Sequence, residues 1–202
     1  MKREQGEKDS RVNFLATQVW PSARTAAHAL ERHLPERTSS VCEFGCGPGL
    51  PSLTAAQLGA PLVYATDLDA FALQLVHEAA QAQGLSETIE TKVFDLVHGY
   101  TDEIPFADLY LFSDVFECGD VAEGAARVTA KVLERRRGGT GPTVWVFAQS
   151  DRAQREIYLG ELQRLLQDPS LYWQSNDQQG AIQSDNRLWL CNIDETKDVQ
   201  YG

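Results

Sequence analysis

The clearest indication of a ligand-binding site in the chain is a set of three glycines in the segment 41–50, V-C-E-F-G-C-G-P-G-L. Gly45, Gly47 and Gly49 follow an apolar stretch and precede a predicted helix. Glycine permits a positive φ and lets the backbone approach a ligand closely. A phosphate-binding P-loop would need Lys followed by Ser or Thr after its second glycine, and a dinucleotide fingerprint would need glycine where Leu50 stands. The segment fits neither pattern.

An acidic residue, Glu43, stands in the predicted strand that leads into these glycines. A carboxylate on a buried parallel strand is costly unless another group compensates its charge. It would repel a pyrophosphate, but it would attract the ammonium and sulfonium groups of S-adenosylmethionine. The segment VCEFGCGPG fits the pattern apolar-x-acid-apolar-G-x-G-x-G of an S-adenosylmethionine loop, which would include Cys46. The alternative is an acidic edge residue beside an unrelated glycine-rich turn, with Cys46 a small buried residue.

Two more acidic residues end predicted strands at positions suited to a nucleoside. Asp67 follows the last loop glycine by 18 residues, close to the ~20 expected for a ribose-binding acid. Leu68 would then lie against the adenine face. The carboxylate of Asp95 can accept the adenine amino group, while the backbone N–H of Leu96 faces a ring nitrogen. A helix N-cap at Asp67 and a simple turn at Asp95 are the alternatives.

Another group of polar residues lies at the carboxyl end of the predicted strand 107–115, beside the glycine loop. Ser113 and Asp114 are near the end of that strand, and Glu117 follows it. We expect Ser113 on the cofactor side, and we assign Asp114 and Glu117 to an acceptor pocket as candidate catalytic residues. Methyl transfer is an in-line displacement, so much of its catalysis comes from positioning. A nearby carboxylate raises a lysine pKa, so the two acids would attract and orient an ammonium. Support of the loop by Asp114 and a solvated acid at Glu117 are the alternatives.

Short apolar runs alternate with amphipathic segments along the chain. Helices are expected over 21–34, 50–60, 70–84, 120–137 and 151–168, and strands over 41–45, 62–67, 88–95, 107–115, 143–149 and 187–194. This alternation predicts βαβ units, a mainly parallel sheet and helices on both of its faces. The carboxyl ends of the strands then bring the glycine loop and the acidic residues to one edge.

The charge composition of the chain argues against some classes of binding partner. The 202 residues carry 18 Lys and Arg against 29 Asp and Glu, a net charge of −11. This balance argues against nucleic-acid or anionic-membrane partners. Residues 38–126 hold fourteen acids and one base, Lys92. That acidity favours a sulfonium cofactor and a cationic acceptor side chain on a protein substrate.

The chain is expected to form one domain over 19–195, with a flexible arm at 1–18 and a tail at 196–202. The first residues lack the apolar segment of a secretory signal. The cysteines are scattered except for Cys42 and Cys46, and no second Cys or His pair at zinc spacing follows that C-x3-C pair. These features favour a reducing compartment, so we predict the cytoplasm, with the nucleus as the alternative. We also predict that the protein is a monomer and holds no metal.

The loop, Asp67 and Asp95 resemble those of class I S-adenosylmethionine-dependent methyltransferases. This resemblance implies a Rossmann-like seven-stranded sheet whose last strand, 187–194, is antiparallel, with S-adenosylhomocysteine as the product. The segment V19-W-P-S-A23 looks like the W-x-x-A element of methyltransferase family 16, the protein lysine methyltransferase-like group, and implies that Trp20 packs near the cofactor. That family usually carries D-x-x-Y after the fourth strand, where this chain has Asp114-Val-Phe-Glu117.

The leading hypothesis is therefore a methyltransferase that modifies a protein side chain, with lysine as the first candidate. A small-molecule methyltransferase on the same fold is an alternative. A non-catalytic module that keeps the cofactor pocket is another, because the family tyrosine is replaced by Glu117.

Overall fold

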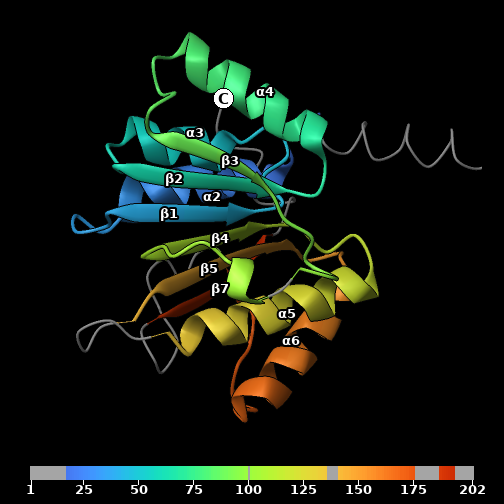
Figure 1. The fold of residues 1–202 in the computed structure, drawn as a ribbon. Coiled ribbons are helices and arrows are strands. Elements are labelled where there is room, and N and C mark those ends of the chain that lie inside the picture. Colours follow the sequence, from blue (N-terminus) through green and yellow to red (C-terminus); the bar gives the residue numbers. More distant parts are fainter. Residues whose placement is uncertain (1–16, 100, 136–140, 176–186, 194–202) are drawn as a thin grey trace, which may run out of the picture.

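The computed structural model describes residues 17–99, 101–135, 141–175 and 187–193 (Figure 1). Most of the predicted arm and the whole predicted tail lie outside these ranges. The helices are α2 (Pro21–His33), α3 (Leu50–Gln57), α4 (Ala70–Ala82), α5 (Gly119–Leu133) and α6 (Gln154–Leu166), with a short 3-10 turn at Thr101–Glu103. The strands are β1 (Ser40–Phe44), β2 (Leu62–Asp67), β3 (Ile89–Val93), β4 (Leu109–Ser113), β5 (Thr143–Gln149), β6 (Gln174–Ser175) and β7 (Leu188–Ile193).

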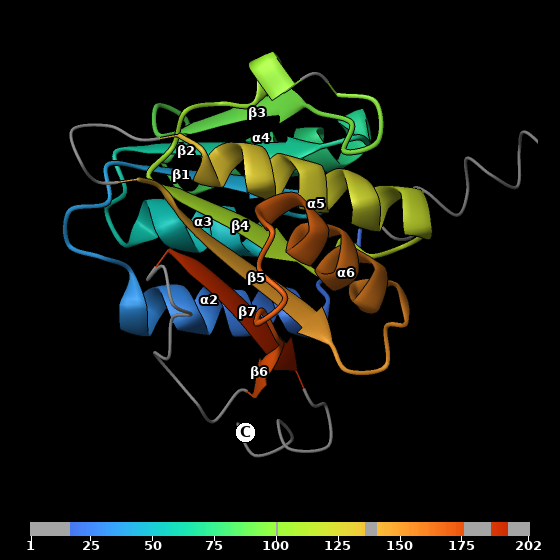
Figure 2. The same ribbon diagram turned by 90° about the horizontal axis from the view of Figure 1, so that it is seen from below.

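The strands form one sheet in the order β3-β2-β1-β4-β5-β7-β6, and every pair in it is parallel. Helices α2, α3 and α4 cover one face and helices α5 and α6 cover the other, as Figures 1 and 2 show. The predicted α/β class, the mainly parallel sheet and the helices on both faces are confirmed. The two-residue strand β6 matches no segment that the sequence pattern predicted.

The direction predicted for the last strand is wrong. Strand β7 runs parallel to β5, and its register pairs Val144 with Leu188 and Gln149 with Ile193. Its side chains are buried on both faces, with Leu190 in the core beneath α5 and α6 and Trp189 in the core beneath α2. An apolar run buried on both faces looks the same in either direction, so the sequence pattern located this strand without encoding its polarity.

Local sequence explains how the elements around the site begin and end. The carboxylate of Asp69 accepts a 2.8 Å hydrogen bond from the backbone N–H of Phe71 and so caps α4. Gly84, with φ of +71°, follows the carboxyl end of that helix. Helix α5 ends at Leu133 and α6 begins at Gln154, so both are shorter than predicted. No helix in the described part of the chain is long and apolar enough to cross a bilayer.

Candidate functional site

Strand order places the predicted site residues along one edge of the sheet. The order β3-β2-β1-β4 brings four neighbouring strands together, and the predicted site residues lie at or just after their carboxyl ends: Asp95, Asp67, the glycine loop and Asp114. Strands β2 and β4 flank β1 on opposite sides, so the chain reverses its winding direction here. In open parallel sheets, ligands bind outside the carboxyl ends of the strands at such a switch point. The topology thus gathers residues that lie far apart in the sequence.

The glycine loop has the backbone conformation that its sequence predicted. Gly45, Gly47 and Gly49 have φ values of +63°, +50° and +76°, a region that other residues rarely adopt. Packing imposes a second requirement, because a Cβ on Gly45 or Gly49 would lie 2.6 Å from a methyl group of Val115 or Val76, respectively. These glycines therefore let the loop fit between the β4 end and α4.

Glu43 is fully buried at the entrance to this loop. Its Oε2 accepts hydrogen bonds from the backbone N–H of Ser52 at 3.0 Å and from the Ser52 hydroxyl at 2.6 Å. Its Oε1 is buried without a hydrogen-bond partner. Burial raises the pKa of Glu43 to about 8, although the Ser52 hydrogen bonds oppose this change. A buried carboxyl with one unpaired oxygen suits a cationic ligand group, since such a group would satisfy that oxygen and favour the charged form.

Asp67 holds the loop in place. Its Oδ2 accepts a 2.9 Å hydrogen bond from the backbone N–H of Gly47, and its Oδ1 accepts one of 2.9 Å from that of Asp69. Burial raises the pKa of Asp67, and these backbone bonds partly oppose the effect. Because Asp69 caps α4, Asp67 is not the helix cap and its remaining lone pairs are available to ribose hydroxyls. The neighbouring Leu68 side chain is 62% exposed at the same edge.

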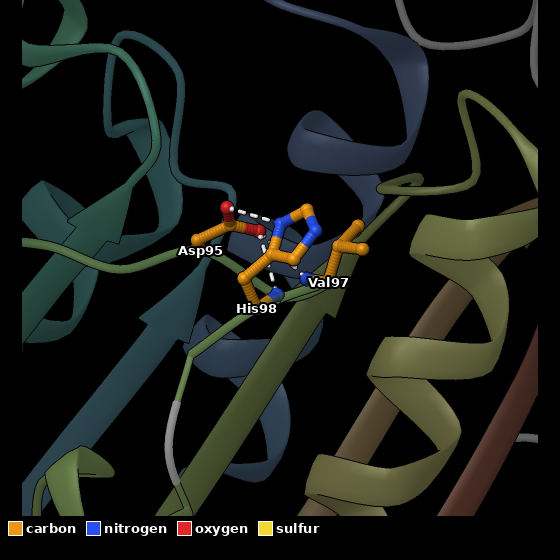
Figure 3. A network of polar contacts seen from close by, with 3 residues as sticks. All are labelled: Asp95, Val97 and His98. Atoms are coloured by element: carbon orange, nitrogen blue, oxygen red, sulfur yellow. Dashed lines mark hydrogen bonds and ion pairs between the residues drawn. The ribbon is translucent and has the colours of Figure 1, made fainter.

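A polar network surrounds Asp95 (Figure 3). Its Oδ1 accepts hydrogen bonds from the backbone N–H groups of Val97 at 2.7 Å and His98 at 3.1 Å, and its Oδ2 lies 3.0 Å from Nδ1 of His98. Burial alone would raise the pKa of Asp95, but the bonds from His98 and the backbone outweigh it, so the pKa is lowered. The following residue, Leu96, is partly buried against the core. No sequence pattern connected His98 with Asp95.

Asp114 is buried and paired with a cation that the sequence did not single out. Its side chain is 1% exposed, and its Oδ2 lies 3.2 Å from Nε of Arg152. The Arg152 guanidinium carbon lies 5.6 Å from the centroid of the Trp20 ring. Trp20 is the N-cap residue of α2, at the predicted W-x-x-A element. The three side chains thus link the start of α2, the end of β4 and the loop before α6.

The other predicted site residues have simpler surroundings. Ser113 is the last residue of β4, and its buried hydroxyl has no hydrogen-bond partner. Glu117 is exposed. Cys46 is buried, and its Sγ lies 3.5 Å from the carbonyl oxygen of Gly47. Cys42 and Cys46 belong to the cores on opposite faces of the sheet. Within the described ranges, no three His, Cys, Asp or Glu side chains group to hold a metal ion.

A known family model matches slightly less than half of the chain. Residues 20–106 match the family model of ribosomal protein L11 methyltransferase (PrmA). That match covers α2, the glycine loop and the segments that hold Asp67 and Asp95, and it stops short of Asp114. The matched part is similar to a class I S-adenosylmethionine-dependent methyltransferase. The model that matches is that of PrmA and not of methyltransferase family 16, so the narrower resemblance stays a prediction.

Individual relatives also match part of the chain. The ribosomal protein L11 methyltransferase of Legionella pneumophila strain Paris is 42% identical over 105 residues, which cover 50% of this chain and 36% of the relative. That of Dichelobacter nodosus is 37% identical over 73 residues, covering 36% of this chain and 25% of the relative. The chain therefore spans about a third or less of the length of these relatives. Among solved structures, it resembles the cyclase SpnF with 17% identity and a TM-score of 0.49, over 71% of this chain and 56% of that one.

Proposed function

We propose that this chain is an S-adenosylmethionine-dependent methyltransferase that modifies a side-chain nitrogen of a protein, with lysine as the first candidate. The observation that carries the proposal is Glu43, fully buried beside three left-handed glycines, with one carboxylate oxygen left unpaired. The family model that matches residues 20–106 and the relatives that match part of this chain are named for a methyltransferase of a ribosomal protein. Their name supports a protein acceptor, and ribosomal protein L11 is the first defined one to test.

In this proposal the cofactor residues hold three parts of one ligand. Glu43 and the loop glycines would bind the methionine part, and Asp67 with Leu68 would hold the ribose and one adenine face. Asp95 and the backbone N–H of Leu96 would recognise the adenine edge, with Cys46, Ser113 and Trp20 completing the contacts. When bound, S-adenosylmethionine supplies the methyl group on a cationic sulfur.

On the acceptor side, the chain would orient a nitrogen lone pair and exclude water. Asp114 has a buried, unpaired oxygen that can accept an N–H from the acceptor. Glu117 is exposed and stands where family 16 members carry a tyrosine, so we give it the weaker task of attracting a cationic side chain. A lysine ammonium would have to lose its proton before attack. We also propose that the protein acts as a monomer in the cytoplasm.

Label transfer tests this function. The full chain is incubated with methyl-labelled S-adenosylmethionine and, in separate reactions, with ribosomal protein L11 and with a cell lysate. Radioactivity in protein, located by mass spectrometry at a lysine side chain, is the expected result. Label recovered only in small molecules would favour the small-molecule alternative. Cofactor binding without transfer to any fraction would favour a non-catalytic module.

A further inference from the structure

The two carboxylate oxygens of Asp114 differ in their hydrogen bonding. Its Oδ2 is held by Nε of Arg152 at 3.2 Å, whereas its Oδ1 is buried and has no hydrogen-bond partner. The backbone of Asp114 has a φ of +56°, in the left-handed region that Asp tolerates better than most residues. Non-glycine residues in this region carry strain and concentrate at functional sites. Arg152 thus holds one oxygen of the carboxylate, and the other oxygen remains able to accept a hydrogen bond.

Arg152 is itself held from two sides. Its backbone N–H donates a 3.2 Å hydrogen bond to the carbonyl oxygen of Gln149, which ends β5 beside the site edge. Its guanidinium lies over the ring of Trp20 at 5.6 Å, within the range of a cation–π interaction. Stacking on an aromatic ring and directional bonding to a carboxylate both depend on the planar guanidinium, which lysine lacks.

We propose that Arg152 is a positioning residue of the transfer site, which holds Asp114 by Oδ2 so that Oδ1 is left to accept an N–H from the acceptor. Trp20 fixes the guanidinium in this arrangement. The inference rests on the proposed function, and it gives the two predicted residues Trp20 and Asp114 a common partner. It also changes the role first expected for Asp114, because a carboxylate already paired with Arg152 contributes little net charge for attracting a distant ammonium.

The charges around Asp114 agree with this role. Burial raises the pKa of Asp114 to about 6. Arg152 and the nearby backbone N–H of Gln149 oppose that rise, and the carboxylate of Asp151 adds to it. Arg152 therefore helps to keep Asp114 ionised at neutral pH, so that both oxygens remain hydrogen-bond acceptors. An opposite charge at this range lowers a carboxyl pKa by about 1–3 pH units, so removal of the guanidinium would raise the pKa of Asp114 and increase the protonated fraction of its carboxyl at pH 7.

The test compares the full-length wild type with Arg152→Gln and Arg152→Lys. Arg164→Gln is the matched control, because Arg164 pairs with Glu161 on the exposed surface of α6. Carbon-13 NMR follows the Asp114 carboxyl through a pH titration, with Asp114→Asn identifying its signal. We expect Arg152→Gln to raise the Asp114 pKa by at least about one pH unit, Arg152→Lys to raise it less, and Arg164→Gln to leave it unchanged.

Transfer kinetics provide the second measurement. With affinity for S-adenosylhomocysteine retained, Arg152→Gln is expected to lower kcat by about 100-fold and to move the acidic limb of the pH–rate profile upward, with partial recovery in Arg152→Lys. An Asp114 pKa and a pH limb that stay at their wild-type positions would overturn the role of Arg152. If Arg152→Gln does not fold, Arg152→Lys decides by the same NMR titration. A wild type that binds no S-adenosylhomocysteine would instead overturn the proposed function, while the NMR result would still report whether Arg152 controls Asp114.

Discussion

Replacing Glu43 by Gln should strengthen the ligand-free fold at neutral and alkaline pH while weakening cofactor binding. Glu43 is fully buried, and its pKa rises from the usual 4.5 to about 8. At about 1.4 kcal/mol per pH unit, this difference corresponds to about 5 kcal/mol of unfolding free energy. Because the folded-state pKa is the higher one, this stability is fully present below pH 4.5 and is lost as the pH rises through about 8. A glutamine keeps the shape but cannot ionise.

The expected magnitude follows from these two pKa values. Between pH 4.5 and pH 8 the wild type should lose about 4 kcal/mol relative to Glu43→Gln, which corresponds to about 10 °C in Tm for a chain of this length. Thermal unfolding from pH 5 to pH 8.5 measures this difference. Glu87→Gln is the control, because Glu87 is exposed. Equal pH slopes for the wild type and Glu43→Gln would refute a strained, buried carboxyl.

Cofactor binding should release the proton that the Glu43 carboxyl carries. At pH 7 a group of pKa about 8 is about 90% protonated, and a bound ammonium should drive it to the carboxylate. Calorimetry with S-adenosylhomocysteine in two buffers of different ionisation enthalpy should therefore find about 0.9 proton released per ligand at pH 7, and none in Glu43→Gln. The wild-type affinity should rise about ninefold from pH 6 to pH 7 and about fivefold from pH 7 to pH 8. An affinity that does not depend on pH would contradict the pairing of Glu43 with the ligand.

Three further predictions concern the loop and the nucleoside residues. Gly49→Ala should lower Tm because its Cβ would lie 2.6 Å from Val76. Gly160→Ala is in a helix with no atom near the new methyl group, and it should raise stability by up to about 1 kcal/mol. Thermal unfolding compares the two variants, and equal shifts in Tm would contradict the packing account. Asp67→Ala should weaken S-adenosylhomocysteine binding by about 10- to 100-fold in calorimetry, and unchanged affinity would dismiss its ribose role. His98→Ala should raise the pKa of Asp95 toward its ordinary value, since the bonds from His98 lower it; a carboxyl NMR titration that shows no change would contradict this contact.

The sequence predicted those parts of the fold that depend on local pattern. Apolar runs located strands such as Leu62–Asp67 and Thr143–Gln149 at their observed bounds, and the glycine spacing predicted a loop with positive φ. The polarity of β7 was not predictable in this way, because Leu188–Ile193 is buried on both faces and its pattern carries no direction. Its antiparallel orientation came from the family resemblance and was wrong.

The candidate site was predictable where one segment contains the whole motif, as in the glycine loop. Contacts between distant segments were not. Arg152 lies 38 residues from Asp114, and only the neighbouring positions of β4 and β5 bring the two together. Ser52 and His98 bond to Glu43 and Asp95 through side chains whose direction depends on local backbone conformation. A serine or histidine at those positions has no distinguishing sequence pattern.

The central claim is that this edge of the sheet binds S-adenosylmethionine, and calorimetric titration of the full chain with S-adenosylhomocysteine tests it most directly. Gly47→Arg would place a large side chain in the loop and would disfavour the φ of +50° that Gly47 adopts. The control, Gly160→Arg, makes the same change at an exposed helix position with no neighbouring atom within 4 Å. We expect one ligand to bind per chain in the wild type and in Gly160→Arg, and no binding in Gly47→Arg. Absence of heat in the wild type at millimolar ligand, or equal binding in Gly47→Arg, would contradict the claim.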